Sequence, residues 1–298
     1  METMTASPSS VKPTRSHYSG VCHGTVGELF QGPYIDGNTP QIAIISLPVR
    51  RYSWAHYSLF PDSEGGGLED RSRCLRAIDL FLQRHGVSLP AGRWCFATDL
   101  LRGKGMASST ADIVATIRCL DAIFGTQSAD IIPAILKEIE RSDSVFLQTH
   151  ALYLSGVQKI VARLPFNPSF QVCFIDEGNV IDTEAMGERL LAHYTAKAAA
   201  YASVLEEIVG AFARGDALAI AGCATRSAIL GQDVLPKQSL EPMLARQTEF
   251  GADGLVVAHT GSLIGYLFRS SPEVQRVGEL SAFFLELGYQ CQCIQSGF

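Results

Sequence analysis

GKGMASSTADI, residues 103–113, is the stretch that decides the fold of this chain. Two glycines and three successive hydroxyl residues lead into a segment with apolar side chains at helical spacing: Ile113, Ile117, Leu120 and Phe124. Free amides at a helix start favour an anion, and hydroxyls beside them can bind phosphate or Mg²⁺. The stretch predicts a polyphosphate loop before an amphipathic helix that stops at Gly125, with a simple helix N-cap as the alternative. It is not a Walker A loop, because no Gly-Lys-Ser/Thr ends it.

Two further glycine-bearing segments predict that this loop is one wall of a cleft. GTVGELFQG (24–32) combines three glycines with a carboxylate and precedes the apolar run 42–49. AHTGSLIG (258–265) lies between apolar runs, a pattern typical of strand, tight loop and strand. Three such loops, near the start, middle and end of the chain, suit one cleft assembled from distant segments.

These motifs resemble those of the GHMP superfamily of small-molecule kinases. The family's central motif reads roughly Pro-x-x-x-Gly-Leu-Gly-Ser-Ser-Ala, and residues 105–110 stand in its last six places. Leu101 replaces the proline and Ala107 replaces the second glycine. Ala107 therefore needs a negative φ or a tolerated strain.

Within the superfamily the chain looks most like the L-threonine kinases of propanediol utilisation and cobalamin biosynthesis. The shared patterns cover residues 27–32, 105–112, 176–183 (Asp-x-Gly-x-Val-x-Asp-Thr) and 256–262. The likeness extends from about Tyr18 to the C-terminus. Residues 152–155 and 184–186 depart from the threonine-kinase pattern, so the nucleotide half matches better than the acceptor half.

The resemblance implies an α+β, GHMP-kinase-like fold of two domains with the active site in the cleft between them. We expect a flexible tail over 1–16, an N-terminal mixed α/β domain over 17–165, and a ferredoxin-like C-terminal domain over 166–298. Periodicity predicts helices at 71–85, 131–139, 204–212 and 272–287, strands at 42–49, 52–60, 94–98, 170–176, 255–257, 263–268 and 289–294, and a loop at 62–67.

The resemblance also implies roles for residues of the three loops. ATP would be held by the central loop, through Gly103, Lys104, Gly105, Met106, Ala107, Ser108, Ser109 and Thr110. The acceptor would be contacted by the first and third motifs, through Glu28, Gln31, Thr260, Gly261 and Ser262. For Glu28 and Gln31, turn stabilisation is the alternative role. His259 is a weaker acid–base candidate.

Catalytic and metal-binding carboxylates are expected in KEIERSDSVF (137–146). Asp143 lies in Ser-Asp-Ser-Val-Phe, which looks like the segment of GHMP kinases that places an Asp by the acceptor hydroxyl. Asp143 and Ser109 are therefore the predicted catalytic residues, although an Asp in a helix-terminal turn is a common structural feature. Ser109 and Glu140 are assigned to Mg²⁺, while Glu138 and Glu140 also fit solvated helix positions.

Composition limits the partners. The chain has 298 residues, is 47% hydrophobic and has a net charge of −6 without a basic run, so nucleic acid and anionic membranes are not expected. No apolar stretch approaches the ~20 residues of a membrane span, and residues 1–16 lack the apolar core of a signal peptide. We expect a cytoplasmic protein with a small-molecule substrate, and a homodimer is one option for its assembly.

The eight cysteines are scattered, and several lie in apolar runs. This usage indicates reduced, buried thiols. Cys291 and Cys293 alternate with glutamines, which indicates one face of a strand more than a metal site, because structural zinc sites have four ligands.

The leading hypothesis is a Mg²⁺- and ATP-dependent kinase that phosphorylates the side-chain hydroxyl of a small amino acid, L-threonine first. One alternative keeps the kinase and changes the acceptor to homoserine, serine or an amino alcohol. Another is an ATP-using decarboxylase of a phosphorylated acid, which the lack of a basic cluster near the loops disfavours. The last is a non-catalytic nucleotide-binding relative.

Overall fold

The computed structural model describes residues 16–59, 67–178 and 187–298. The predicted N-terminal tail (apart from Ser16), most of the predicted loop at 62–67, and residues 179–183 of the Asp-x-Gly pattern lie outside these ranges. No helix in the described part of the chain has the length and apolar character needed to cross a bilayer.

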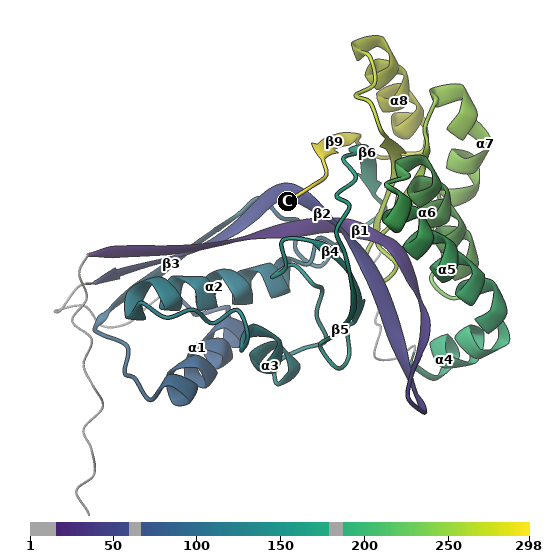
Figure 1. The fold of residues 1–298 in the computed structure, drawn as a ribbon. Helices are drawn as coiled ribbons and strands as arrows, with labels where there is room; N and C mark the ends of the chain where they lie inside the picture. The colour runs from purple at the N-terminus through teal and green to yellow at the C-terminus, as the bar shows by residue number, and fades with distance from the viewer. Residues whose placement is uncertain (1–15, 60–66, 179–186) are drawn as a thin grey trace, which may run out of the picture.

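The described residues form one antiparallel sheet with helices packed against it (Figure 1). Its strand order is β5-β4-β2-β1-β7-β8-β6-β9, and β3 pairs with β2 outside this path. The strands are β1 (His17–Asp36), β2 (Thr39–Leu59), β3 (Gly92–Thr98), β4 (His150–Leu154), β5 (Lys159–Leu164), β6 (Gln171–Asp176), β7 (Gly254–Val257), β8 (Leu263–Phe268) and β9 (Gln292–Gln295).

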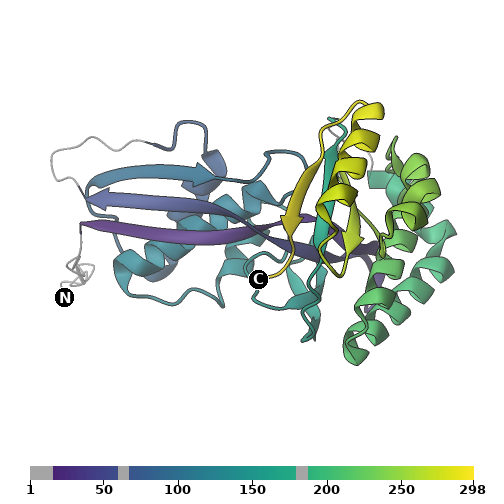
Figure 2. The same ribbon diagram turned by 90° about the horizontal axis from the view of Figure 1, so that it is seen from above.

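The β1–β2 hairpin runs through the length of the sheet (Figure 2). The prediction of a loop at 24–32 is wrong, because this segment lies inside β1. Its glycine-rich sequence is accommodated by register shifts on both sides of Glu28, and Gly27 adopts φ +71° there. The strands predicted at 42–49 and 52–60 are likewise one strand, β2.

Helices α1 (Ser72–His85), α2 (Ser108–Phe124) and α3 (Ile132–Lys137) lie together beneath the end of the sheet that contains β3 (Figure 1). The α2 residues Ile113, Ile117, Leu120 and Phe124 are buried as predicted. The prediction of an amphipathic helix is wrong, however, because the sheet and α1 contact α2 from different sides and bury most of its surface.

The second half of the chain supplies helices α4 (Gly187–Ala196), α5 (Ala198–Arg214), α6 (Ala217–Gly231), α7 (Leu240–Phe250) and α8 (Val274–Glu286). Helices α5 and α6 pack against β1, so the two halves share one large apolar core, while a second core lies between β6–β8, α7 and α8. Strand β1 pairs with β7 at Glu28↔Val257. The division into 17–165 and 166–298 stays a proposal, with Glu28 at the point where the halves meet.

Candidate active site

The loop between β3 and α2 has a backbone shape that leaves the start of α2 open. Ala107, the N-cap residue, adopts the left-handed region with φ 53°, and its side chain forms no capping hydrogen bond. Of the two options for Ala107, a negative φ or a tolerated strain, the structure has the second, and Ala107 carries strain that the family's glycine avoids. The first amide groups of α2 thus lack a side-chain partner at the helix end and can bind an anion.

Hydrogen bonds join the other two motifs to this loop. Thr25 and Gly27 of β1 donate their backbone N–H groups to the carbonyls of Met106 and Gly105, at 3.2 and 3.3 Å. The backbone N–H of Ser262, in the loop between β7 and β8, donates to the Lys104 carbonyl at 2.9 Å. The three glycine-bearing motifs therefore meet in space.

The glycines at this junction permit the close approach. A Cβ atom on Gly105 would lie 2.2 Å from the Cβ of Ala258, and one on Gly261 would lie 2.2 Å from the Lys104 carbonyl oxygen. Real Cβ atoms do not approach other atoms so closely. Both positions thus require glycine for the loops to pack.

Glu140 accepts hydrogen bonds from two hydroxyl groups at the start of α2. Ser109 Oγ donates to Glu140 Oε2 at 2.8 Å, and Thr110 Oγ1 donates to Oε1 at 2.7 Å. Arg73 Nη1 lies 2.7 Å from Glu140 Oε2, and the Glu140 side chain is 9% exposed. The alternative of a solvated helix residue is therefore wrong for Glu140. Hydroxyl and carboxylate oxygens are ligands that suit Mg²⁺.

Arginines gather beside the same loop. A cavity of about 340 Å³ is bordered by Arg71, Arg73, Arg102, Gly103, Ser108 and Ser109, among others. The prediction that no basic cluster lies near the loops is wrong, because the start of α1 brings two arginines to residues 102–109. The planar guanidinium group of arginine presents paired N–H donors that match the oxygens of a phosphate group. Asp112, near the start of α2, forms an ion pair with Arg71 and accepts a hydrogen bond from the Ser53 hydroxyl. These contacts orient the Arg71 guanidinium.

A second, smaller cavity lies where the first and third motifs meet the segment after α3. It has a volume of about 140 Å³ and is lined by Glu28, Gln31, Ile44, Arg141, Ser142, Asp143, Ser155 and Thr260. Three of the predicted acceptor residues and the predicted catalytic Asp143 thus border one space. The Cα atoms of Glu140 and Asp143 are at most ~11 Å apart, since the two residues are three positions apart in the chain. The segment therefore links both cavities.

Asp143 is held at the wall of this cavity. Ser46 on β2 donates its hydroxyl to Asp143 Oδ1 at 2.8 Å. The pKa of the Asp143 carboxyl is raised to about 7, first by burial and then by the negative charge of Glu28, while the Ser46 hydrogen bond acts in the opposite direction. A carboxyl group with this pKa can exchange a proton near neutral pH.

The other polar residues of the cavity are positioned from different elements. Glu28 Oε2 accepts hydrogen bonds from the backbone N–H and the Nδ1 of His259, at 2.9 and 3.0 Å. Gln31 Nε2 donates to the hydroxyl of Tyr194 on α4 at 3.0 Å. Arg141 Nε donates to Ser155 Oγ at 2.8 Å. The cavity thus combines two carboxylates, a guanidinium and an amide.

Some predicted residues lie beside these cavities and not in their walls. The Lys104 ammonium is 3.3 Å from Asp176 Oδ2, and Ser262 donates its hydroxyl to Asp176 Oδ1. The Gly261 carbonyl accepts from the buried Lys237 ammonium at 2.6 Å. These contacts hold the third loop against the phosphate loop.

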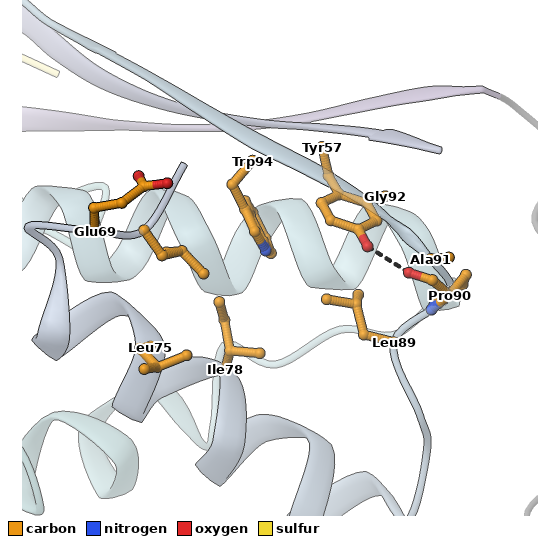
Figure 3. Close-up of a pocket in the computed structure, with 10 residues that line it drawn as sticks. Tyr57, Glu69, Leu75, Ile78, Leu89, Pro90, Ala91, Gly92 and Trp94 are labelled. Atoms are coloured by element: carbon orange, nitrogen blue, oxygen red, sulfur yellow. Dashed lines mark hydrogen bonds between the residues drawn. The ribbon is translucent and has the colours of Figure 1, made fainter. Parts of the chain in front are cut away.

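A third cavity, of about 510 Å³, lies between α1 and the β2–β3 strands (Figure 3). Tyr57, Trp94, Ile78 and Leu89 form apolar walls, and Tyr57 donates its hydroxyl to the Pro90 carbonyl. Glu69 is the charged residue among the described lining residues, so this space has no cation for phosphate.

Sequence reasoning did not single out Arg141 or the three arginines near the loop. Arg141 stands within KEIERSDSVF, the segment already selected for its carboxylates, and a cation beside a candidate catalytic Asp was an available signal. Arg71 and Arg73 lie about 30 residues before the loop, and only tertiary packing brings α1 to it.

Comparison with known proteins identifies the central part of this arrangement. Residues 72–148, from α1 through the segment after α3, match the family model described as "GHMP kinases N terminal domain". This segment is therefore similar to the N-terminal domain of GHMP kinases. The GHMP resemblance inferred from residues 105–110 is thus confirmed by a match that contains the phosphate loop, Glu140 and Asp143.

A curated relative extends the likeness beyond the GHMP domain. The L-threonine kinase of Citrobacter freundii is 28% identical over 253 residues, which cover 83% of this chain and 84% of that protein. The similarity to L-threonine kinases is therefore shown across most of the chain.

Solved structures confirm the fold class. The mevalonate kinase of L. major, solved with R-mevalonate, superposes with a TM-score of 0.74 at 14% identity and covers 96% of this chain and 98% of its own. The homoserine kinase of Cytophaga hutchinsonii gives a TM-score of 0.69 at 14% identity, with 96% of each chain covered. At such identities these structures establish the GHMP-kinase-like fold of the chain and leave its acceptor open.

Proposed function

We propose that this protein is a Mg²⁺- and ATP-dependent kinase that phosphorylates the side-chain hydroxyl of a small amino acid, most specifically L-threonine. The observation that carries the proposal is the 140 Å³ cavity, in which Arg141, Glu28 and Asp143 surround one small space. A zwitterionic amino acid needs a cation for its carboxylate and an anion for its ammonium. A third group is needed at the hydroxyl.

Each residue of the cavity has a role that its charge supports. The Arg141 guanidinium would bind the α-carboxylate as a planar donor pair. The Glu28 carboxylate would face the α-ammonium. Asp143 would orient the acceptor hydroxyl and accept its proton as the new O–P bond forms. The volume is below the ~300–1,000 Å³ of pockets for larger ligands, which suits a small acceptor.

Ile44 supports threonine over serine within this proposal. It is the aliphatic side chain among the described residues that line the cavity, and it is buried on β2. A methyl group of the acceptor that packs against Ile44 would be removed from water. The Citrobacter freundii relative, named an L-threonine kinase, supports the same acceptor.

The nucleotide would lie on the other side of the 140–143 segment. The α2 amides with Arg71, Arg73 and Arg102 fit a polyphosphate, and Ser109, Thr110 and Glu140 fit Mg²⁺. Bound Mg²⁺ would neutralise phosphate charge during transfer. Arg73 now neutralises Glu140, and its exposed side chain can turn toward phosphate when the metal binds. The apolar cavity beside Trp94 would take the base (Figure 3).

The decarboxylase alternative is less well supported. Its acceptor is a phosphorylated acid with several negative charges, whereas the acceptor cavity holds two carboxylates against one guanidinium. The clustered arginines border the phosphate-loop cavity instead. Charge repulsion therefore disfavours a polyanionic acceptor.

The experiment is an acceptor panel with Mg-ATP, scored by ADP release and product mass: L-threonine, L-serine, L-homoserine, and threoninol, which lacks the carboxylate. We expect phosphothreonine as the best product and at least tenfold lower kcat/KM for threoninol. Arg141→Met should raise KM for threonine at least tenfold and leave KM for ATP within twofold. Arg163→Met, an exposed exchange on β5, is the matched control.

Equal use of threonine and threoninol by the wild-type enzyme would refute carboxylate recognition by Arg141. ADP release with no member of the panel would refute the proposed acceptor class.

A further inference from the structure

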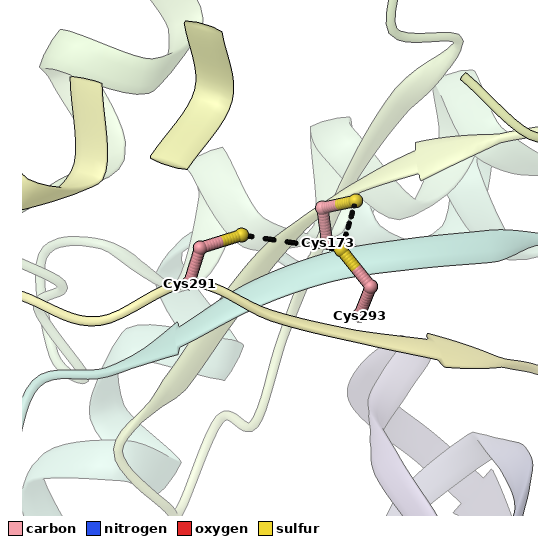
Figure 4. A group of neighbouring side chains, drawn as sticks. All are labelled: Cys173, Cys291 and Cys293. Atoms are coloured by element: carbon pink, nitrogen blue, oxygen red, sulfur yellow. Dashed lines mark hydrogen bonds between the residues drawn. The ribbon is translucent and has the colours of Figure 1, made fainter. Parts of the chain in front are cut away.

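Three cysteine sulfurs converge at the β6–β9 edge of the sheet (Figure 4). Cys173 on β6 stands directly opposite Cys293 on β9 in the antiparallel pair, and their sulfurs are 2.8 Å apart. Cys291, two residues before Cys293 and therefore on the same side of the chain, places its sulfur 4.0 Å from that of Cys293. All three sulfur atoms lie within 4.8 Å of one another.

The cluster differs from the buried thiols expected from the sequence. Cys173 is fully buried, whereas Cys291 is partly exposed and Cys293 is exposed, so solvent reaches one side of the group. The expectation of buried thiols is wrong for Cys293 and also for Cys95 on β3. Cys173 is about 120 residues from the other two, which is why spacing alone shows only a two-cysteine pattern.

We propose that Cys173, Cys291 and Cys293 form a binding site for a thiophilic d¹⁰ metal ion, and we take Zn²⁺ as the reference ion. Three sulfur donors without an oxygen ligand exclude the hard ions Mg²⁺ and Ca²⁺ and select soft ones. The three thiols lose their protons to solvent as three Zn–S bonds form, and a water molecule takes the fourth, exposed position. This site is separate from the predicted Mg²⁺ residues of the phosphate loop.

The geometry needs a small adjustment to hold the ion. Zn–S bonds of about 2.3 Å at tetrahedral angles place sulfurs roughly 3.8 Å apart. The Cys291–Cys293 separation of 4.0 Å already agrees, and the Cys173–Cys293 separation of 2.8 Å has to widen by about 1 Å. Cys293 is exposed and can make this change by a side-chain rotation.

Metal binding at this site would cross-link β9, the last strand of the sheet, to β6. β9 is the terminal strand of the sheet order, and it pairs with β6 over four residue pairs. A bond network from Cys173 to both sides of Gln292 would cross-link this edge. An ion that binds the folded state and not the unfolded chain raises the melting temperature.

The test uses the full-length chain, reduced and stripped of metal, and titrated with Zn²⁺ and, in a second arm, with Cu⁺. Bound metal is counted by mass spectrometry after gel filtration, and Cd²⁺ is added as a probe for its thiolate charge-transfer absorption. We expect one equivalent per chain, thiolate absorption with Cd²⁺, and a higher melting temperature. The arm with tighter binding identifies the ion.

Cys293→Ser is the main variant because an exposed position tolerates the exchange, and Cys291→Ser is the second. Each should lower zinc affinity at least tenfold, while Cys95→Ser, an exposed cysteine outside the cluster, should bind as the wild type does. Unchanged affinity in both cluster variants would overturn the proposal. So would a mass lower by two hydrogens and a Cys173–Cys293 cross-linked peptide from protein kept in air with one equivalent of zinc, which would assign a disulfide.

Discussion

Asp143→Asn separates the proposed role of this residue in proton transfer from a role in packing. The exchange preserves side-chain size, and Ser46 can still donate its 2.8 Å hydrogen bond to the amide oxygen. The amide cannot accept the proton of the acceptor hydroxyl. We therefore expect turnover to fall by ~10²–10⁴-fold, with a value near the lower end because a loose transition state releases the proton late. The dissociation constant of ATP should stay within twofold.

The pH dependence gives a second signature of the same residue. Burial raises the Asp143 pKa to about 7, so wild-type turnover should increase with pH through about 7 as the carboxylate forms. The residual activity of the variant should lack this increase. The assay is turnover at saturating substrates between pH 5.5 and 9, in buffers of constant ionic strength.

Stability should change in the opposite direction. Between about pH 4 and 7 the folded state keeps the Asp143 proton that the unfolded chain has lost, so wild-type stability falls as pH rises through this window. The rise of the Asp143 pKa from the ordinary value of 3.8 to about 7 sets an upper limit of about 4 kcal/mol on this loss of stability. Relaxation of the protein around a buried charge lowers this cost. At pH 8 the Asn variant should therefore be more stable by on the order of 1 kcal/mol or more, which raises Tm by about 2 °C or more.

The control is Asp130→Asn, an exposed exchange that should alter neither property. Two results would refute the reasoning: wild-type turnover in the Asp143 variant, or a stability difference that is the same at pH 4 and pH 8. Loss of ATP affinity with turnover preserved at saturation would move Asp143 to the nucleotide side.

Three further predictions test the other parts of the site. Ser109→Ala should lower turnover at least tenfold and raise the Mg²⁺ concentration needed for half-maximal rate, because it removes one oxygen of the Ser109–Glu140 group, and an unchanged Mg²⁺ titration would exclude Ser109 from the metal site. Mg-ATP at 100 times its dissociation constant should stabilise the protein by about 2.7 kcal/mol, measured as a melting shift that ATP with EDTA reduces; no shift at millimolar Mg-ATP would favour another ligand. Ile44→Ala should reduce the threonine-to-serine ratio of kcat/KM by about tenfold, as one methyl contact is worth ~1–3 kcal/mol, and a constant ratio would remove Ile44 from acceptor selection.

The parts of the fold that were predictable are those set by local pattern. The four apolar residues of α2 lie in the core as their spacing predicts, and Gly125 ends the helix in the left-handed region. The surroundings of α2 were not predictable in this way, because a helix buried between a sheet and other helices loses the polar face on which amphipathic periodicity depends. The prediction of a loop at 24–32 was wrong for a related reason, since glycines that suggest a loop can also form a bulge within a long strand.

The residues of the candidate site likewise divide into those that local sequence predicts and those that only tertiary packing brings together. Residues on one motif, such as Ser109 and Thr110, could be selected from the loop sequence, and Asp143 from its likeness to a family segment. The arginines at the start of α1 could not be placed, because their positions depend on how α1 packs against the loop. Arg141 could have been selected, because it lies two residues from Asp143 in a segment already chosen for its carboxylates. Cys173 joins Cys291 and Cys293 only through the β6–β9 pairing, which closes a separation of about 120 residues.

The strained residue in the phosphate loop shows how these levels depend on each other. A non-glycine residue in the left-handed region costs roughly 1–2 kcal/mol, and Ala107 adopts it with φ 53°. The loop's own sequence does not favour this shape at Ala107. The shape is held from outside, by the hydrogen bonds that Thr25, Gly27 and Ser262 donate to the carbonyls of residues 104–106. The first and third motifs therefore determine the loop conformation that leaves the α2 amides open, in addition to lining the proposed acceptor cavity. A change that weakens either junction should disturb nucleotide binding even though it touches no phosphate-binding group.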